Sequence, residues 1–156
     1  MSLPHTLIPA GALRFHGETE MLGEMLGELT GKIVGQRVVP HHHRGGHLKI
    51  ERTMESKGKI LGEEVTLLAT FWSMERPQGG MFSRGRGVLT TKKGEKVMLR
   101  GAGISVPSKG AGWSMRGSRY AQTSSAALKR LNEAVLLFET EITPDGMVRD
   151  KWWEWK

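Results

Sequence analysis

The chain has 156 residues, a length that fits one domain with a single core. It contains no cysteine, which excludes disulfides, cysteine zinc sites and thiol nucleophiles. Hydrophobic residues make up 38% and charged residues 25%, the formal net charge is +7, and 21 glycines indicate many turns and bent strands.

The N-terminal region predicts little regular structure. We expect residues 1–12 to form a loose arm. The first twenty residues lack the basic start and apolar block of a signal sequence, and the longest apolar run, AVLLF at 134–138, is too short to span a bilayer. We therefore expect a soluble, cytoplasmic protein without membrane contact.

The stretch at 20–31, EMLGEMLGELTG, is ambiguous. Its apolar residues have helical spacing, but Gly23 and Gly27 would each cost a helix about 1 kcal/mol relative to alanine. A helix and an irregular segment both stay open for it.

Candidate strands follow at short spacing, separated by turn residues. They span 32–39, 48–56, 60–74, 81–91, 95–106, 113–123, 133–143 and 147–155. The turns are predicted at 57–58, 76–80, 92–95, 107–112 and 144–146, all rich in glycine or proline. A short helix is predicted over 124–132, where SSAALKRLN has capping serines and paired leucines. The pattern predicts one all-β domain over 1–156: an antiparallel eight-stranded meander barrel with one short helix before the last two strands.

The central strands separate glycine from arginine. Alternate residues of a strand face opposite sides of the sheet. Over 81–91, 95–106 and 113–123, odd positions give glycines with apolar residues, whereas even positions carry four arginines. These are Arg84, Arg86, Arg100 and Arg116, which define the arginine face. Residues 76–130 hold twelve basic side chains and one acidic, so this face lies in a strongly basic block.

Two orientations of these strands are open. With the glycine face inside, small residues allow tight curvature and leave the arginine face for solvent or a partner. With the arginine face inside, the guanidinium groups need a ligand anion or carboxylates from the last strands, because unpaired buried charge is prohibitive. Those carboxylates are Glu139, Glu141 and Glu154, and Tyr120 lies among the arginines. The apolar content of the glycine face favours the first orientation.

Other motifs carry less weight. GAGISV at 101–106 begins like a dinucleotide fingerprint, but Val106 replaces its last glycine and no helix follows. His41, His43 and His47 are weak candidates for metal ligands, with no acidic or cysteine ligand nearby. The tryptophans of KWWEWK at the C-terminus are expected to pack in the core. No catalytic motif is present, so we expect no cofactor. The sequence favours a protein that is not an enzyme, and a catalytic role stays open.

Five stretches together resemble an uncharacterised family of small bacterial and archaeal β-barrel proteins. They are GRGVLTTKKGE (85–95), RGSRYAQTSS (116–125), LN (131–132), FETEITPDG (138–146) and WEWK (153–156). No activity comes with this resemblance. The predicted meander also looks, more loosely, like the allene oxide cyclase type of barrel, but the catalytic residues of that enzyme have no match here.

Three functional hypotheses follow. The first is a homo-oligomeric barrel that binds a small anionic or lipophilic molecule in its lumen or mouth, with the arginine face, Tyr120 and the three glutamates as site candidates. The second is a module that binds nucleic acid or another acidic macromolecule on the arginine face. The third is a structural oligomer that buries this face between subunits. We favour the first.

Overall fold

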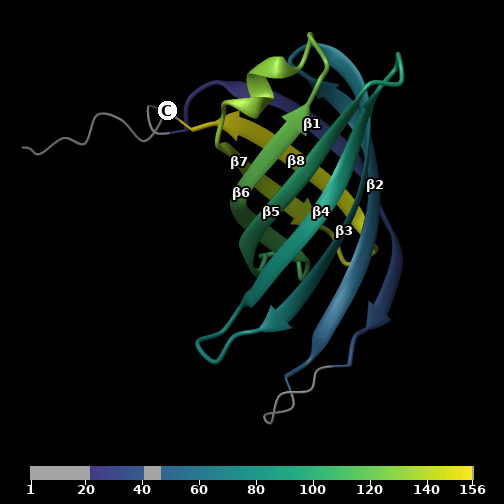
Figure 1. Ribbon diagram of the computed structural model, residues 1–156. Helices are drawn as coiled ribbons and strands as arrows, with labels where there is room; N and C mark the ends of the chain where they lie inside the picture. The colour runs from purple at the N-terminus through teal and green to yellow at the C-terminus, as the bar shows by residue number, and fades with distance from the viewer. Residues whose placement is uncertain (1–21, 41–46, 156) are drawn as a thin grey trace, which may run out of the picture.

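A computed structural model describes residues 22–40 and 47–155 and is a closed barrel of antiparallel strands (Figure 1). Each strand pairs with the next along the chain, and β8 returns to β1. The strands are β1 (Met25–Val38), β2 (Lys49–Ile60), β3 (Glu63–Glu75), β4 (Met81–Thr91), β5 (Lys96–Pro107), β6 (Trp113–Thr123), β7 (Leu136–Ile142) and β8 (Met147–Glu154). A 3-10 helix, η1 (Lys129–Asn132), precedes β7. The predicted all-β class, the eight-stranded meander barrel and the short helix before the last two strands are confirmed.

Four of the five predicted turns are confirmed. Each joins two neighbouring strands at the predicted residues, and Gly79, Gly80, Gly94 and Gly146 have the positive φ that such turns need. The turn predicted at 57–58 is wrong, because these residues lie inside β2. A Cβ on Gly58 would lie 2.1 Å from the carbonyl oxygen of Glu28, so this glycine permits a close approach of β1 and β2.

The first strand is longer than predicted. It begins at Met25, so the stretch with helical spacing is largely β-strand. Leu26 and Leu29 are both buried although they are three residues apart, because a bulge between Met25 and Gly27 shifts the register against β8. The arm predicted for residues 1–12 lies outside the described residues.

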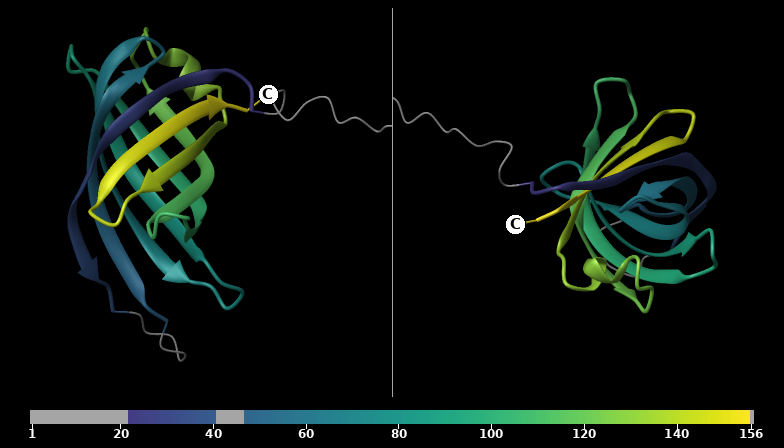
Figure 2. Two further views of the ribbon diagram at one scale, coloured as in Figure 1. Left: turned by 180° about the vertical axis from the view of Figure 1, so that it is seen from behind. Right: turned by 90° about the horizontal axis from the view of Figure 1, so that it is seen from above.

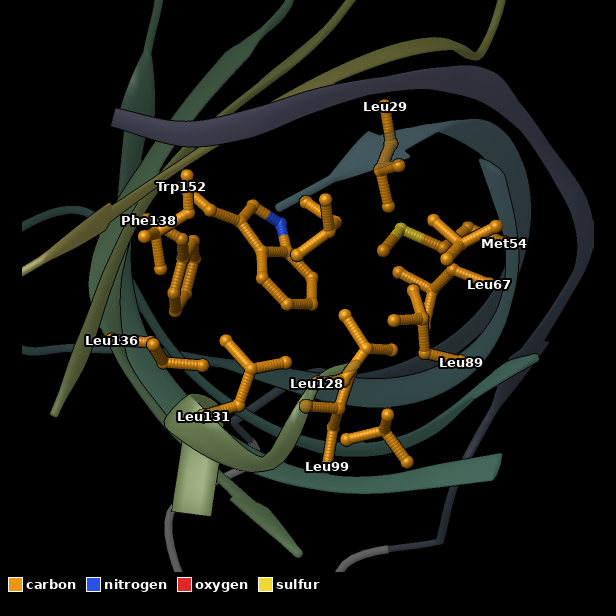
Figure 3. Packing of buried hydrophobic residues seen from close by; sticks show 14 of the residues in the cluster. Leu29, Met54, Leu67, Leu89, Leu99, Leu128, Leu131, Leu136, Phe138 and Trp152 are labelled. Carbon is orange, nitrogen blue, oxygen red and sulfur yellow. The ribbon is translucent and has the colours of Figure 1, made fainter. Parts of the chain in front are cut away.

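The core fills one end of the lumen. Leu128, which precedes η1, and Leu131, which lies within it, have no exposed surface. In the core they lie beside Leu136 and next to the ring of Trp152 (Figure 3). The end-on view in Figure 2 shows the short η1 helix at the side of the ring of strands. No helix of the two described ranges is long and apolar enough to cross a membrane.

The opposite end has an uneven rim. Pairing of β1 with β8 ends at Lys32 and Met147, whereas pairing of β1 with β2 continues to Val38 and Ile50. The strands β1 to β4 therefore run on past the turn between β7 and β8 (Figure 1). We call this end the mouth of the barrel.

The seam between β1 and β8 is held at the surface by an ion pair. Arg149 Nε donates to Glu28 Oε1 at 2.6 Å, and this hydrogen bond lowers the pKa of the Glu28 carboxyl. Because both side chains are partly exposed, the pair adds little to the main-chain hydrogen bonds that close the barrel.

Candidate functional site

The glycine face lies inside the barrel. On β4, Ser83, Gly87 and Leu89 are buried, whereas Arg84 and Arg86 are exposed. The orientation that the apolar content favoured is confirmed, and the alternative with the arginine face inside is wrong. Glycine is required on this face by space, since a Cβ on Gly103 would lie 2.5 Å from the carbonyl oxygen of Arg116 on the next strand.

The site candidates named from the sequence do not gather in the lumen. The side chains of Arg84, Arg86, Arg100, Arg116 and Tyr120 are all on the exposed outer surface. Glu139 and Glu141 alternate with the buried residues of β7 and so also face outward. Their role as ligand-binding residues stays a prediction, and a ligand that contacts them would have to bind on the outer surface of the barrel.

Two of the acidic candidates have surface partners. Arg116 Nη2 donates to Glu139 Oε1 at 3.3 Å. Glu154 accepts a hydrogen bond from Arg130, which also bonds Glu24. Both contacts are structural ion pairs. The pair of Arg116 with Glu139 lies on the outer surface, whereas Glu154 is in phase with buried Trp152 on β8, opposite buried Leu136.

The predicted histidine cluster cannot be assembled from the described residues. His41 and His43 lie outside them, and His47 is exposed. Within 22–40 and 47–155, no three histidine or acidic side chains are grouped as a metal site.

The lumen contains an ion pair that the sequence reasoning missed. Arg119 on β6 is 8% exposed and Asp150 on β8 is fully buried. Arg119 Nη1 donates to Asp150 Oδ2 at 2.6 Å and Nη2 to Oδ1 at 3.0 Å, a bidentate geometry. Thr140 Oγ1 and Trp152 Nε1 also donate to this carboxylate, at 2.6 and 2.7 Å. Four hydrogen bonds thus compensate Asp150 for the loss of water.

Aromatic rings hold the Arg119 guanidinium in place. Its central carbon lies 4.0 Å from the ring centre of Phe138 and 4.7 Å from that of Trp152, both within cation–π range. A guanidinium has five N–H donors. In the described part of the chain, its hydrogen bonds to protein atoms go to Asp150 alone, so further donors remain for water or a ligand.

A cavity lies beside this ion pair. Its volume is about 50 Å³, by a measure on which one water molecule needs roughly 10–15 Å³. Arg119 is the inward-facing charged residue of its wall, and the rest of the inward lining is mostly apolar or glycine. The apolar and glycine positions are Met54, Leu67, Ala69, Phe71, Gly85, Gly87, Leu99, Gly101, Gly103, Met115 and Phe138. Arg84, Arg86 and Arg100 also border it, and since their side chains point outward, they do so with main-chain atoms.

The alternation in the sequence contained the signal for this site. Arg119 is the charged residue at an odd, glycine-face position of β6. Asp150 alternates with Val148 and Trp152, both buried. When two strands of a small barrel each carry a charged residue at a position that faces the core, and the charges are opposite, the two residues are candidates for an ion pair in the lumen.

The arginine face outside the barrel has a local conflict of charge. Arg86 and Arg100 lie directly opposite each other in the β4–β5 register, and like charges at such positions destabilise a sheet. Neither has an ion-pair partner among the described residues, since β4, β5 and β6 contain no aspartate or glutamate. Tyr120 lies opposite Arg100 on the other side and is 58% exposed. The result is an uncompensated cationic surface beside an exposed ring.

An apolar groove lies further round the outer surface. It has a volume of about 750 Å³ and crosses β4 to β8. Its apolar lining includes Phe82, Ile104, Leu137 and Trp153, with Arg116 and Glu139 also in its wall.

Comparison with known proteins gives fold relatives. No family model matches the chain, and no curated protein matches it in sequence. A protein of unknown function from Clostridium acetobutylicum superposes with a TM-score of 0.71 at 14% identity, covering 85% of this chain and 98% of that one. A conserved protein of unknown function from Rhodopseudomonas palustris gives 0.69 at 14%, covering 84% and 95%. A β-barrel-like protein from Acinetobacter baumannii gives 0.70 at 14%, covering 84% and 94%.

These three likenesses show the fold alone, because the identities are low. They agree with the resemblance to small bacterial barrels of unknown function. None of the three concerns an allene oxide cyclase, so that looser resemblance stays a prediction.

Proposed function

We propose that the protein binds a small, largely apolar molecule in the lumen cavity, with Arg119 as its polar contact. The observation that carries this proposal is a buried guanidinium that borders a cavity and has donors left over after its bond to Asp150. A ligand oxygen in the cavity could accept a hydrogen bond from these donors in place of water.

The chemistry of the cavity limits the ligand. Because Asp150 neutralises the charge of Arg119, the contact there suits a neutral acceptor such as a carbonyl or hydroxyl oxygen. Met54, Phe71 and Leu99 offer apolar contact to the rest of the molecule. The small volume favours a short, slender molecule over a drug-sized one.

Filling the cavity tests the proposal. Ala69 lies on its wall and faces inward, so Ala69→Phe would place a ring in the space. Leu68→Phe is the matched control, since Leu68 is the neighbouring residue and is 52% exposed on the outside. We expect wild type and Leu68→Phe to bind 1-hexanol in calorimetry, and Ala69→Phe to bind it at least about tenfold more weakly. Equal binding by both variants at an unchanged melting temperature would contradict the proposal.

A second candidate function rests on the charge conflict between Arg86 and Arg100. An anion bound between these two arginines would reduce the repulsion between their charges, which no carboxylate of the described residues offsets. Tyr120 offers a ring on which a base can stack. We therefore propose single-stranded nucleic acid as the partner of the arginine face.

The second candidate has its own test. A fluorescent oligothymidine should bind at low salt and be released steeply as salt rises. Arg86→Ala with Arg100→Ala should weaken this binding at least about tenfold. Lys57→Ala with Lys59→Ala removes equal charge from the outer face of β2 and should have the smaller effect. Absence of binding at low salt, or equal loss in both double variants, would reject this candidate.

The homo-oligomer expected from the sequence stays a prediction. The apolar groove over β4 to β8 supports it, since exposed apolar surface of this kind is often an interface. Native mass spectrometry would give the number of subunits and the mass of any retained ligand together.

A further inference from the structure

A second guanidinium faces the lumen, near the mouth. Arg52 on β2 lies opposite Phe71 on β3, and directly opposed residues point to the same side of a sheet. Phe71 is buried in the core, and so is Met54, which follows Arg52 by two residues on the same face. Arg52 is therefore an inward-facing cation near the mouth of the barrel.

Within 22–40 and 47–155, Arg52 has no carboxylate partner. Its Nε donates to Gln36 Oε1 on β1 at 2.9 Å, which is a neutral acceptor. Among the described residues, every ion pair involves other side chains. Partial burial lowers the pKa of the Arg52 guanidinium, because the charged form has lost water without gaining a counter-ion. Arg52 differs in this from Arg119, whose charge is neutralised by Asp150.

Arg119 borders the cavity, and Arg52 lies next to two residues of the cavity wall. The cavity is bordered by Arg119 on β6 and by Met54 and Phe71, the two neighbours of Arg52 on the inner face. On that face Ser73 lies diagonally from Arg52, buried and bonded to Ser83 at 2.8 Å. A molecule in the cavity whose end points to the mouth would thus meet Arg52.

We infer that Arg52, oriented by Gln36, binds the acidic group of the lumen ligand. This ligand is a small monocarboxylic acid whose apolar chain carries, at its other end, the oxygen that Arg119 contacts. The inference rests on the proposed function. One uncompensated guanidinium matches one negative charge, and its two Nη groups can bind the two oxygens of a carboxylate. The apolar wall next to it matches a hydrocarbon tail rather than a second charged group.

A carboxylic acid and an alcohol with the same alkyl chain test the inference. Hexanoate and 1-hexanol share a tail and differ in the charged group, and calorimetry at low salt gives the affinity of the full chain for each. We expect wild type to prefer hexanoate. Arg52→Met should lower the affinity for hexanoate about 10- to 100-fold and leave that for 1-hexanol unchanged. Arg37→Met is the matched control, because Arg37 lies on the exposed side of the same rim.

The outcomes separate the two proposals. If hexanoate and 1-hexanol bind equally, or if Arg52→Met keeps the preference for hexanoate, the inference about Arg52 is wrong and the lumen site stands. If wild type binds neither compound, the proposed function fails and the inference fails with it. Equal loss of hexanoate binding in Arg37→Met would also overturn the role of Arg52, because a general loss of positive charge would then account for the effect.

Discussion

Arg119 and Asp150 form an ion pair that is buried within the lumen, whereas the other ion pairs of the described residues are at least partly exposed. Removing two charges from water costs desolvation free energy. The attraction between the charges offsets this cost only when their remaining donors and acceptors are also hydrogen-bonded. Asp150 meets this condition with four hydrogen bonds. Arg119 uses two of its five N–H donors for Asp150, and it borders the cavity.

Removal of the charge on Asp150 should destabilise the fold strongly. Asp150→Asn keeps the shape but leaves the Arg119 charge buried without a counter-ion, so we expect a loss of about 3–5 kcal/mol in urea unfolding. Thr140→Val, which removes one hydrogen bond to the same carboxylate, should cost about 1 kcal/mol. The double variant Arg119→Met with Asp150→Leu should recover most of the loss. Unfolding of Asp150→Asn within 1 kcal/mol of wild type would show that the pair is not a buried charge pair.

At the scale of the elements, the glycines of β4, β5 and β6 allow the strands to curve tightly round a small lumen. These glycines lie very close to the main chain of the neighbouring strand. For example, a Cβ added to Gly117 would lie 2.0 Å from the carbonyl oxygen of Ala102. Because no side chains project from these positions, the space beside Arg119 stays open. The same residues thus provide both the curvature and the cavity.

Substitution by alanine should destabilise the protein at glycines whose surroundings leave no space for a Cβ, and have little effect at glycines with open space around them. Gly103→Ala would force a Cβ against Arg116 and the ring of Phe138, so we expect a loss of about 1–3 kcal/mol. Gly110 lies in the turn between β5 and β6 with nothing within 4 Å of its Cβ position, so Gly110→Ala should change stability by less than about 1 kcal/mol. Thermal unfolding of both variants checks this. Equal melting temperatures would mean that the inner face has more room than the strand spacing indicates.

Most strands could be predicted because explicit turns delimit them. β4 and β6 have their predicted bounds, and glycine-rich turns flank both. The start of β1 was missed because a bulge lets Leu26 and Leu29 both face the core at a spacing that imitates a helix. Alternation predicted which side of the sheet each arginine faces, but it could not pair Arg119 with Asp150. Asp150 is 31 residues away on β8, and β7 lies between β6 and β8 in the sheet. Partners across a closed barrel depend on tilt and register, which local sequence does not encode.

The whole molecule is a barrel with one end filled by Leu128 and Leu131 and the other extended by β1 to β4. Among the described residues, the charges beside the cavity are the neutralised pair of Arg119 and Asp150, and Arg52 is an inward-facing cation nearer the mouth. Outward-facing charge is concentrated on the arginine face. This arrangement supports a ligand that enters with its apolar part first and leaves its acidic group at the mouth.

Methyl NMR of the wild-type protein during titration with hexanoate tests the lumen site most directly. Ala69 and Leu99 line the cavity, and Leu68 lies outside the same wall. The account predicts saturable shifts of the Ala69 and Leu99 methyl signals with one apparent dissociation constant, while the Leu68 signals stay in place. Unchanged Ala69 and Leu99 signals, or shifts confined to Leu68, would contradict it.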